Sequence, residues 1–101
     1  MQFLRELFGK RTDFKKLIEQ GARIIDVRTP AEYGTGHVPG SANISLEQLN
    51  HAVGDLKKKN EAVITCCQSG VRSGVANNVF RKAGIESYNG GSWQNLLKRI
   101  K

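Results

Sequence analysis

Cysteine is scarce in this chain of 101 residues, and its two cysteines, Cys66 and Cys67, are adjacent. Neighbours in sequence cannot join distant parts of a fold, which excludes a structural disulfide framework and favours a reducing compartment such as the cytoplasm. The histidines, His37 and His51, do not complete a standard set of zinc ligands at these spacings. We therefore expect neither a metal nor another cofactor.

Long hydrophobic runs are also absent. No apolar segment approaches the roughly 20 residues that a membrane-spanning helix requires. Residues 1–11 carry Arg5 and Glu6 within their apolar stretch, unlike a signal peptide. No basic segment is interleaved with aromatic residues in the manner of proteins that bind single-stranded nucleic acid. We expect a cytoplasmic monomer that interacts with neither membranes nor nucleic acid.

What the chain does contain is typical of one globular domain over residues 1–101. Hydrophobic residues make up 39% of the chain and charged residues 25%, and this length leaves room for a single core. The net charge is +7. That charge either steers small anions or acidic partners toward the protein or forms a solvated basic surface.

Hydrophobic periodicity and helix-terminal residues predict an alternation of helices and strands. Helices are predicted at residues 2–9, 13–20, 30–34, 45–56, 72–83 and 93–100. Strands are predicted at residues 22–27, 42–44, 61–65 and 85–88. This alternation implies an α/β fold with a mostly parallel sheet of four or five strands and helices on both faces.

Local sequence also predicts how some of these helices begin and which side they bury. Thr29 with Glu32, and Ser45 with Gln48, have the spacing of capping boxes, in which a side chain at each end of the first turn bonds to the backbone at the other. The helix at 72–83 is expected to bury Val75, Val79 and Phe80. These features would fix where the helices begin and which side meets the core.

Cys67 is the most informative residue of the chain. It begins the segment CQSGVRS (residues 67–73), between the strand predicted at 61–65 and the helix predicted at 72–83. In parallel α/β sheets, sites lie at the carboxyl ends of strands. Converging backbone N–H groups and a helix N-terminus there favour thiolate over thiol. The position indicates an activated nucleophile, with a buried inert cysteine as the alternative. Cys66 is expected to point to the opposite face, as a core thiol or as a resolving cysteine.

Three segments, in order, resemble the rhodanese (sulfurtransferase) family. They are IIDVRTPAEYGTGHVPGSANI at residues 24–44, CQSGVRS at residues 67–73 and AGIESYNGGSWQNL at residues 83–96. The resemblance covers about residues 22–101 and leaves residues 1–21 as an N-terminal helical segment. It implies a single-domain rhodanese-like fold in which Cys67 carries sulfur as a persulfide. A small anionic donor such as thiosulfate would supply the sulfur, and cyanide, a small thiol or a protein thiol would accept it.

The resemblance also assigns roles around Cys67, the catalytic residue. The substrate-binding loop would comprise Gln68, Ser69, Gly70, Val71, Arg72 and Ser73. Gly70 is expected to permit the tight turn, and Ser69 and Ser73 either donate hydrogen bonds to the persulfide or cap the helix. Arg72 either contacts an anionic donor or pairs with a carboxylate to brace the loop.

Residues outside the loop are expected to support it. Asp26 and Arg28 would fix the loops beneath the site, and Glu32 is explained as a capping residue. His37 is interpreted as loop packing, and Trp93 as core or pocket wall.

The loop itself separates three candidate functions. Arg72 follows Cys67 by five positions, which matches the sulfur-handling loop, whereas related phosphatases and arsenate reductases have one residue more. Gln68 and Ser69 stand where some thiosulfate-using relatives have basic residues, which leaves open a protein persulfide or another small sulfane compound as the donor. The leading hypothesis is a sulfurtransferase. The alternatives are a non-catalytic persulfide carrier or regulatory binding module, and a phosphatase or arsenate reductase.

Overall fold

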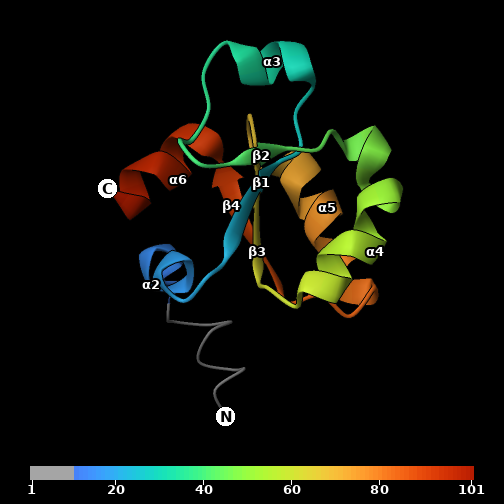
Figure 1. Cartoon of the computed structure of the whole chain (residues 1–101). Helices are drawn as coiled ribbons and strands as arrows, with labels where there is room; N and C mark the ends of the chain where they lie inside the picture. The colour runs from blue at the N-terminus through green and yellow to red at the C-terminus, as the bar shows by residue number, and fades with distance from the viewer. Residues whose placement is uncertain (1–10) are drawn as a thin grey trace.

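Four short strands pair in parallel to form one sheet, in the order β2-β1-β3-β4 (Figure 1). The computed structural model describes residues 11–101, so the helix expected at residues 2–9 lies outside the described residues. The strands are β1 (Arg23–Asp26), β2 (Ala42–Asn43), β3 (Val63–Cys67) and β4 (Ser87–Ser92). The parallel sheet and its flanking helices confirm the predicted α/β fold.

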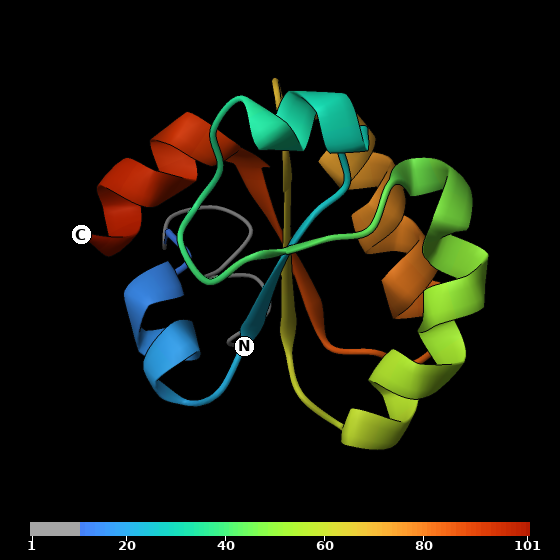
Figure 2. The same cartoon turned by 45° about the horizontal axis from the view of Figure 1, so that its top comes forward.

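Helices cover both faces of the sheet (Figures 1 and 2). On one face lie α2 (Phe14–Glu19) and α6 (Trp93–Ile100), and on the other lie α4 (Leu49–Lys59) and α5 (Val71–Lys82). The short helix α3 (Pro30–Gly34) follows β1 and lies across the edge where β1 and β3 end (Figure 1). Within residues 11–101, no helix has the length and apolar character needed to cross a membrane.

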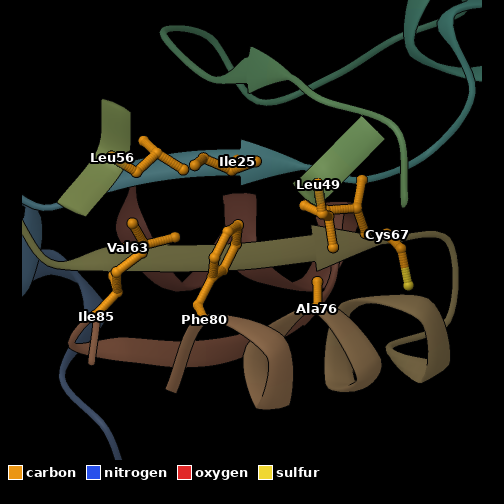
Figure 3. Packing of buried hydrophobic residues seen from close by; sticks show 9 residues of the cluster. Ile25, Leu49, Leu56, Val63, Cys67, Ala76, Phe80 and Ile85 are labelled. Carbon is orange, nitrogen blue, oxygen red and sulfur yellow. The ribbon is translucent and has the colours of Figure 1, made fainter. Parts of the chain in front are cut away.

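Side-chain alternation along β3 divides the core into two clusters. Val63 and Cys67 face α4 and α5, where Phe80 is fully buried (Figure 3). Ile64 and Cys66 face α2 and α6. Burial of one large apolar side chain such as Phe80 contributes about 1.5–3 kcal/mol, so each cluster holds its helices firmly on the sheet. The prediction that the two cysteines point to opposite faces is confirmed.

Local capping signals are confirmed for α3 and fail for the next helix. Thr29 Oγ1 accepts the N–H of Glu32 at 3.2 Å, and Glu32 Oε1 accepts the N–H of Thr29 at 3.1 Å. The capping box predicted from Ser45 and Gln48 is wrong, because neither side chain caps a helix. A 3₁₀ turn, η1 (Leu46–Gln48), forms first, so Gln48 is the N-cap of α4 instead of the third residue of a helix that begins after Ser45.

The prediction that α5 buries Val75 is wrong. Ala76 and Phe80, one turn apart, face the sheet and are fully buried. Val75 is therefore rotated away from the sheet by about 100° around the helix, and 49% of it is exposed. Val71, at the start of the same helix, is 72% exposed. Both valines lie on the surface of the helix that follows Cys67.

Residues 89–91, which follow the strand predicted at 85–88, belong to β4, so this strand runs further than the sequence indicated. The strand continues past a shift in register until Ser92 pairs with Cys67. A side chain at Gly90 would place its Cβ 2.8 Å from the carbonyl oxygen of Thr65, so only glycine allows this close approach. The end of β4 is thereby held against the loop after Cys67.

Candidate active site

The sulfur of Cys67 lies in a cradle of hydrogen-bond donors at the end of β3. Its Sγ accepts the backbone N–H of Gly70 at 3.0 Å and that of Ser73 at 3.3 Å. Gly70 is the N-cap of α5 and has φ = 99°, a left-handed conformation that favours glycine. The chain thus turns back sharply after Cys67, and the first amides of a 12-residue helix point at the sulfur.

The segment from Gln68 to Ser73 lies next to the sulfur through Gly70 and Ser73, and its role in substrate binding stays a prediction. Cys67 and Ser73 have no exposed surface, whereas Gln68, Ser69 and Val71 are exposed. The sulfur therefore sits directly beneath the protein surface, with a partly exposed Gly70 beside it. Figure 3 shows its side chain at the end of β3, next to the first turn of α5.

The two adjacent cysteines differ in acidity. Burial raises the pKa of the Cys67 thiol, but the hydrogen bonds that the ionised sulfur accepts, from the Ser73 hydroxyl and from the N–H groups of Ser73, Gly70 and Ser69, outweigh burial and hold that pKa below its ordinary value. Burial raises the pKa of Cys66 to about 12, and the negative charge of Asp26 adds to the rise. Cys67 is the thiol prepared to ionise, while Cys66 is a neutral core residue.

This difference predicts a selective reaction with iodoacetamide. Because only the thiolate reacts, alkylation of Cys67 in the folded protein should reach half its maximal rate at a lower pH than in the urea-unfolded chain. The pH at half-maximal rate reports the pKa of Cys67, since slow entry of the reagent lowers the rate at every pH alike. Cys66 should stay unmodified throughout. Peptide mass spectrometry over a pH series measures both residues, and a midpoint for folded Cys67 at or above that of the unfolded chain would contradict the prediction.

Arg72 forms a two-point ion pair with Glu32. Its Nη1 and Nη2 atoms lie 2.7 Å and 2.9 Å from the two carboxylate oxygens, although the residues are 40 positions apart. This contact with Arg72 holds the pKa of Glu32 down at about 2, aided by the N–H of Thr29. Of the two roles left open for Arg72, the structure thus has the carboxylate pairing, and it joins α5 to α3 above the site.

Asp26 and Arg28 form a buried ion pair at the end of β1. The guanidinium donates from Nε to Oδ1 at 2.9 Å and from Nη2 to Oδ2 at 2.7 Å, and both residues are at most 1% exposed. Arg28 also donates to the carbonyls of Glu32 and Gly36 and lies over the ring of Trp93. These contacts anchor the segment from α3 to residue 36, which supports the expected role of this pair beneath the loops.

The remaining expected residues take structural positions. The ring of His37 stacks on Tyr33 with centroids 3.7 Å apart, and its Nδ1 lies 2.8 Å from the Tyr33 carbonyl oxygen. The ring of Trp93 packs against the segment after α3, because a Cβ on Gly36 would lie 3.1 Å from that ring. Among residues 11–101, no group of three or more His, Cys, Asp and Glu side chains is placed to hold a metal ion.

Sequence reasoning missed one residue of the site, Asn89. Its side chain donates from Nδ2 to the Gly70 carbonyl at 3.2 Å and accepts from the Ser73 hydroxyl at 2.7 Å and from the Gly91 N–H at 2.9 Å. The sequence placed Asn89 only between the strand predicted at 85–88 and the helix predicted at 93–100. The available signal was its place at the end of a strand, where the carboxyl ends of neighbouring parallel strands meet.

Sequence comparison places this geometry in a known family. The sequence model of the rhodanese-like domain matches residues 10–95. The uncharacterised protein YqhL of Bacillus subtilis is 40% identical over 85 residues, which cover 79% of this chain and 67% of YqhL. The proposed sulfur carrier protein YrkF of Bacillus subtilis is 32% identical over 81 residues, which cover 80% of this chain and 41% of YrkF. The thiosulfate sulfurtransferase PspE of Escherichia coli is 34% identical over 61 residues, which cover 59% of each chain.

Solved structures agree with the sequence comparison. The structure of a rhodanese with anions from E. coli superposes with a TM-score of 0.68 at 30% identity, over 74% of this chain and 91% of that one. The present chain spans about half the length of YrkF and PspE. The matched residues include β1, the Cys67 loop and the end of β4. The chain belongs to the rhodanese-like domain family.

Proposed function

We propose that this protein is a sulfurtransferase that moves a sulfane sulfur through a persulfide on Cys67. The observation that carries the proposal is the cradle of N–H groups from Gly70 and Ser73 around the Cys67 sulfur. Such donors stabilise a thiolate before the reaction, and they are placed to stabilise the anionic terminal sulfur of a persulfide after it. Family membership supports a transferase of this kind.

The proposed reaction has two displacement steps. With thiosulfate as the donor, the Cys67 thiolate attacks the outer sulfur, a new sulfur–sulfur bond forms, and the old one breaks with its electron pair leaving on sulfite. Cys67 then carries a persulfide anion. In the second step an acceptor such as cyanide attacks the terminal sulfur, leaves as thiocyanate and regenerates the thiolate. A small thiol or a protein thiol is the proposed acceptor in the cell.

A persulfide carrier is the second candidate. The site's two arginines, Arg28 and Arg72, are each paired with a carboxylate, and Gln68 and Ser69 are uncharged. An anionic donor would therefore meet only backbone dipoles at the sulfur, which favours delivery of sulfur by a protein partner over fast turnover of thiosulfate. The relative YrkF, named as a proposed sulfur carrier, supports this alternative.

Intact-mass spectrometry combined with a thiosulfate:cyanide assay tests the proposal. We expect the protein to gain one sulfur atom on incubation with thiosulfate or a persulfide donor and to lose it as thiocyanate when cyanide is added. Loading without catalytic turnover would favour the carrier. Failure to take up sulfur from any of these donors, with Cys67 shown to be reduced, would reject both. Cys67-dependent hydrolysis of an aryl phosphate would favour a phosphatase.

Releasing Arg72 from its partner should improve the use of thiosulfate. In Glu32→Gln the carboxylate charge is lost, so the Arg72 guanidinium is free to contact an anionic donor. We expect a severalfold lower KM for thiosulfate, because the freed guanidinium attracts the anionic donor. Glu47→Gln is the control for overall charge, because Glu47 is exposed and lies on η1. An unchanged KM with a lower kcat would show that Arg72 only braces the loop.

A further inference from the structure

The contacts of Asn89 fix the direction of its amide group. The N–H of Gly91 is only a donor and the carbonyl of Gly70 is only an acceptor. The first therefore requires the Asn89 oxygen at 2.9 Å, and the second requires the nitrogen at 3.2 Å. The oxygen consequently faces Ser73, 2.7 Å from its hydroxyl. A carbonyl oxygen cannot donate, so the Ser73 hydroxyl must give its single proton to Asn89.

Ser73 then has no proton left for the sulfur of Cys67. In the thiol form, the Cys67 S–H donates to Ser73 Oγ across 3.4 Å, and the Ser73 O–H donates to Asn89. When the thiol proton leaves to solvent, the sulfur anion would face a lone pair of that oxygen. The contact becomes favourable only if the hydroxyl rotates, breaks its bond to Asn89 and donates to the sulfur.

We propose that Asn89 is a positioning residue that controls hydrogen-bond donation from Ser73 to the Cys67 sulfur. Hydrogen bonds to an ionised acceptor are about twice as strong as those to a neutral one, so the hydroxyl turns to the sulfur when Cys67 ionises. Asn89 then keeps its bond from the Gly91 N–H. The role bears on catalysis because it rests on the proposed function of Cys67 as the sulfur-accepting thiolate.

The charged groups near Cys67 do not compete for this proton. On α5, Arg72 is paired with Glu32 of α3. At the end of β1, Arg28 and Asp26 form an ion pair with each other. Cys66, on the opposite face of β3, has a pKa of about 12 and stays neutral. Asn89 itself is exposed at the mouth of the site, whereas Ser73 is fully buried. The proton of Ser73 is thus shared between one amide oxygen and one sulfur.

The proposal is tested by deleting the Ser73 hydroxyl in different Asn89 backgrounds. The measured quantity is the pKa of Cys67 from the pH dependence of iodoacetamide alkylation, with folding checked by circular dichroism. Ser73→Ala in the parent should raise that pKa by about one unit. In Asn89→Asp the same change should have almost no effect, because a carboxylate retains the proton. In Asn89→Leu, where the hydroxyl is always free, it should raise the pKa by more than in the parent.

In each background, the protein with Ser73 is compared with its Ser73→Ala variant. A loosening of Gly70 or a charge added at position 89 is present in both proteins, so the difference in the pKa of Cys67 reports the hydroxyl alone. A purely structural Asn89 would shift all values but leave the effect of Ser73→Ala equal in the three backgrounds, which would overturn the proposal. If Asn89→Asp does not fold, an effect in Asn89→Leu no larger than in the parent would overturn it as well. No sulfur donor is used, so failure of sulfur loading and failure of this inference are separate results.

Discussion

Cys67→Ser should abolish sulfur loading and lower transfer to cyanide by roughly a thousandfold or more. A serine hydroxyl is not ionised at neutral pH. The N–H groups of Gly70 and Ser73, which stabilise a thiolate at this position, do not acidify a hydroxyl enough to ionise it, and its oxygen cannot carry a persulfide. Intact mass measures the loss of loading, and thiocyanate formation measures the loss of transfer. The exchange alters one buried atom, so the fold should be retained.

Cys66→Ser is the matched control, because it makes the same change one residue earlier on the same strand. Cys66 faces the other cluster and its raised pKa keeps it neutral, so loading should persist. The new hydroxyl is fully buried among apolar side chains and beside the Asp26 carboxylate, so it costs at most about 1–3 kcal/mol of stability, which a thermal melt detects separately. Sulfur on Cys66, or full activity in Cys67→Ser, would reject Cys67 as the carrier.

The sequence was sufficient for the parts of the fold that depend on neighbouring residues. Alternating apolar segments predicted the parallel sheet, and Thr29 with Glu32 predicted a capping box that the structure has. Ser45 failed although its spacing to Gln48 was the same, because the 3₁₀ turn at Leu46–Gln48 delays the α-helix. A capping motif predicts which side chains can bond to the backbone. It does not predict whether the α-helix begins at that position.

The site was predictable only in part, for a similar reason. The position of Cys67 between a strand and a helix follows from a few consecutive residues. The partners that tune it come from elsewhere: Glu32 reaches Arg72 from 40 residues away, and Asn89 reaches Ser73 from 16 residues away. Such contacts arise when the ends of parallel strands are brought together, and no local spacing encodes them. Glu32 shows the limit well, because its local capping role was predicted and its ion pair was not.

Arg28→Met should lower the stability of the protein by about 3–5 kcal/mol. It leaves the buried Asp26 carboxylate without the guanidinium, so that of the bonds from residue 28 it keeps only the one from the backbone N–H, and it removes the bonds to the carbonyls of Glu32 and Gly36. For a domain of this size the loss corresponds to a fall in Tm of more than about 10 °C. Urea unfolding measures the free energy directly.

Arg23→Met provides the contrast, since it makes the same exchange of arginine for methionine at the start of β1, five residues before Arg28. The Arg23–Glu61 pair is 3.8 Å apart with both side chains about 40% exposed, so its loss should cost less than about 1 kcal/mol. Adding Asp26→Asn to Arg28→Met should recover part of the stability, because the uncompensated charge is then absent. Equal losses for the two arginine variants would show that burial of the Asp26–Arg28 pair, and the anchoring of the loop above Cys67 through it, adds nothing to the fold.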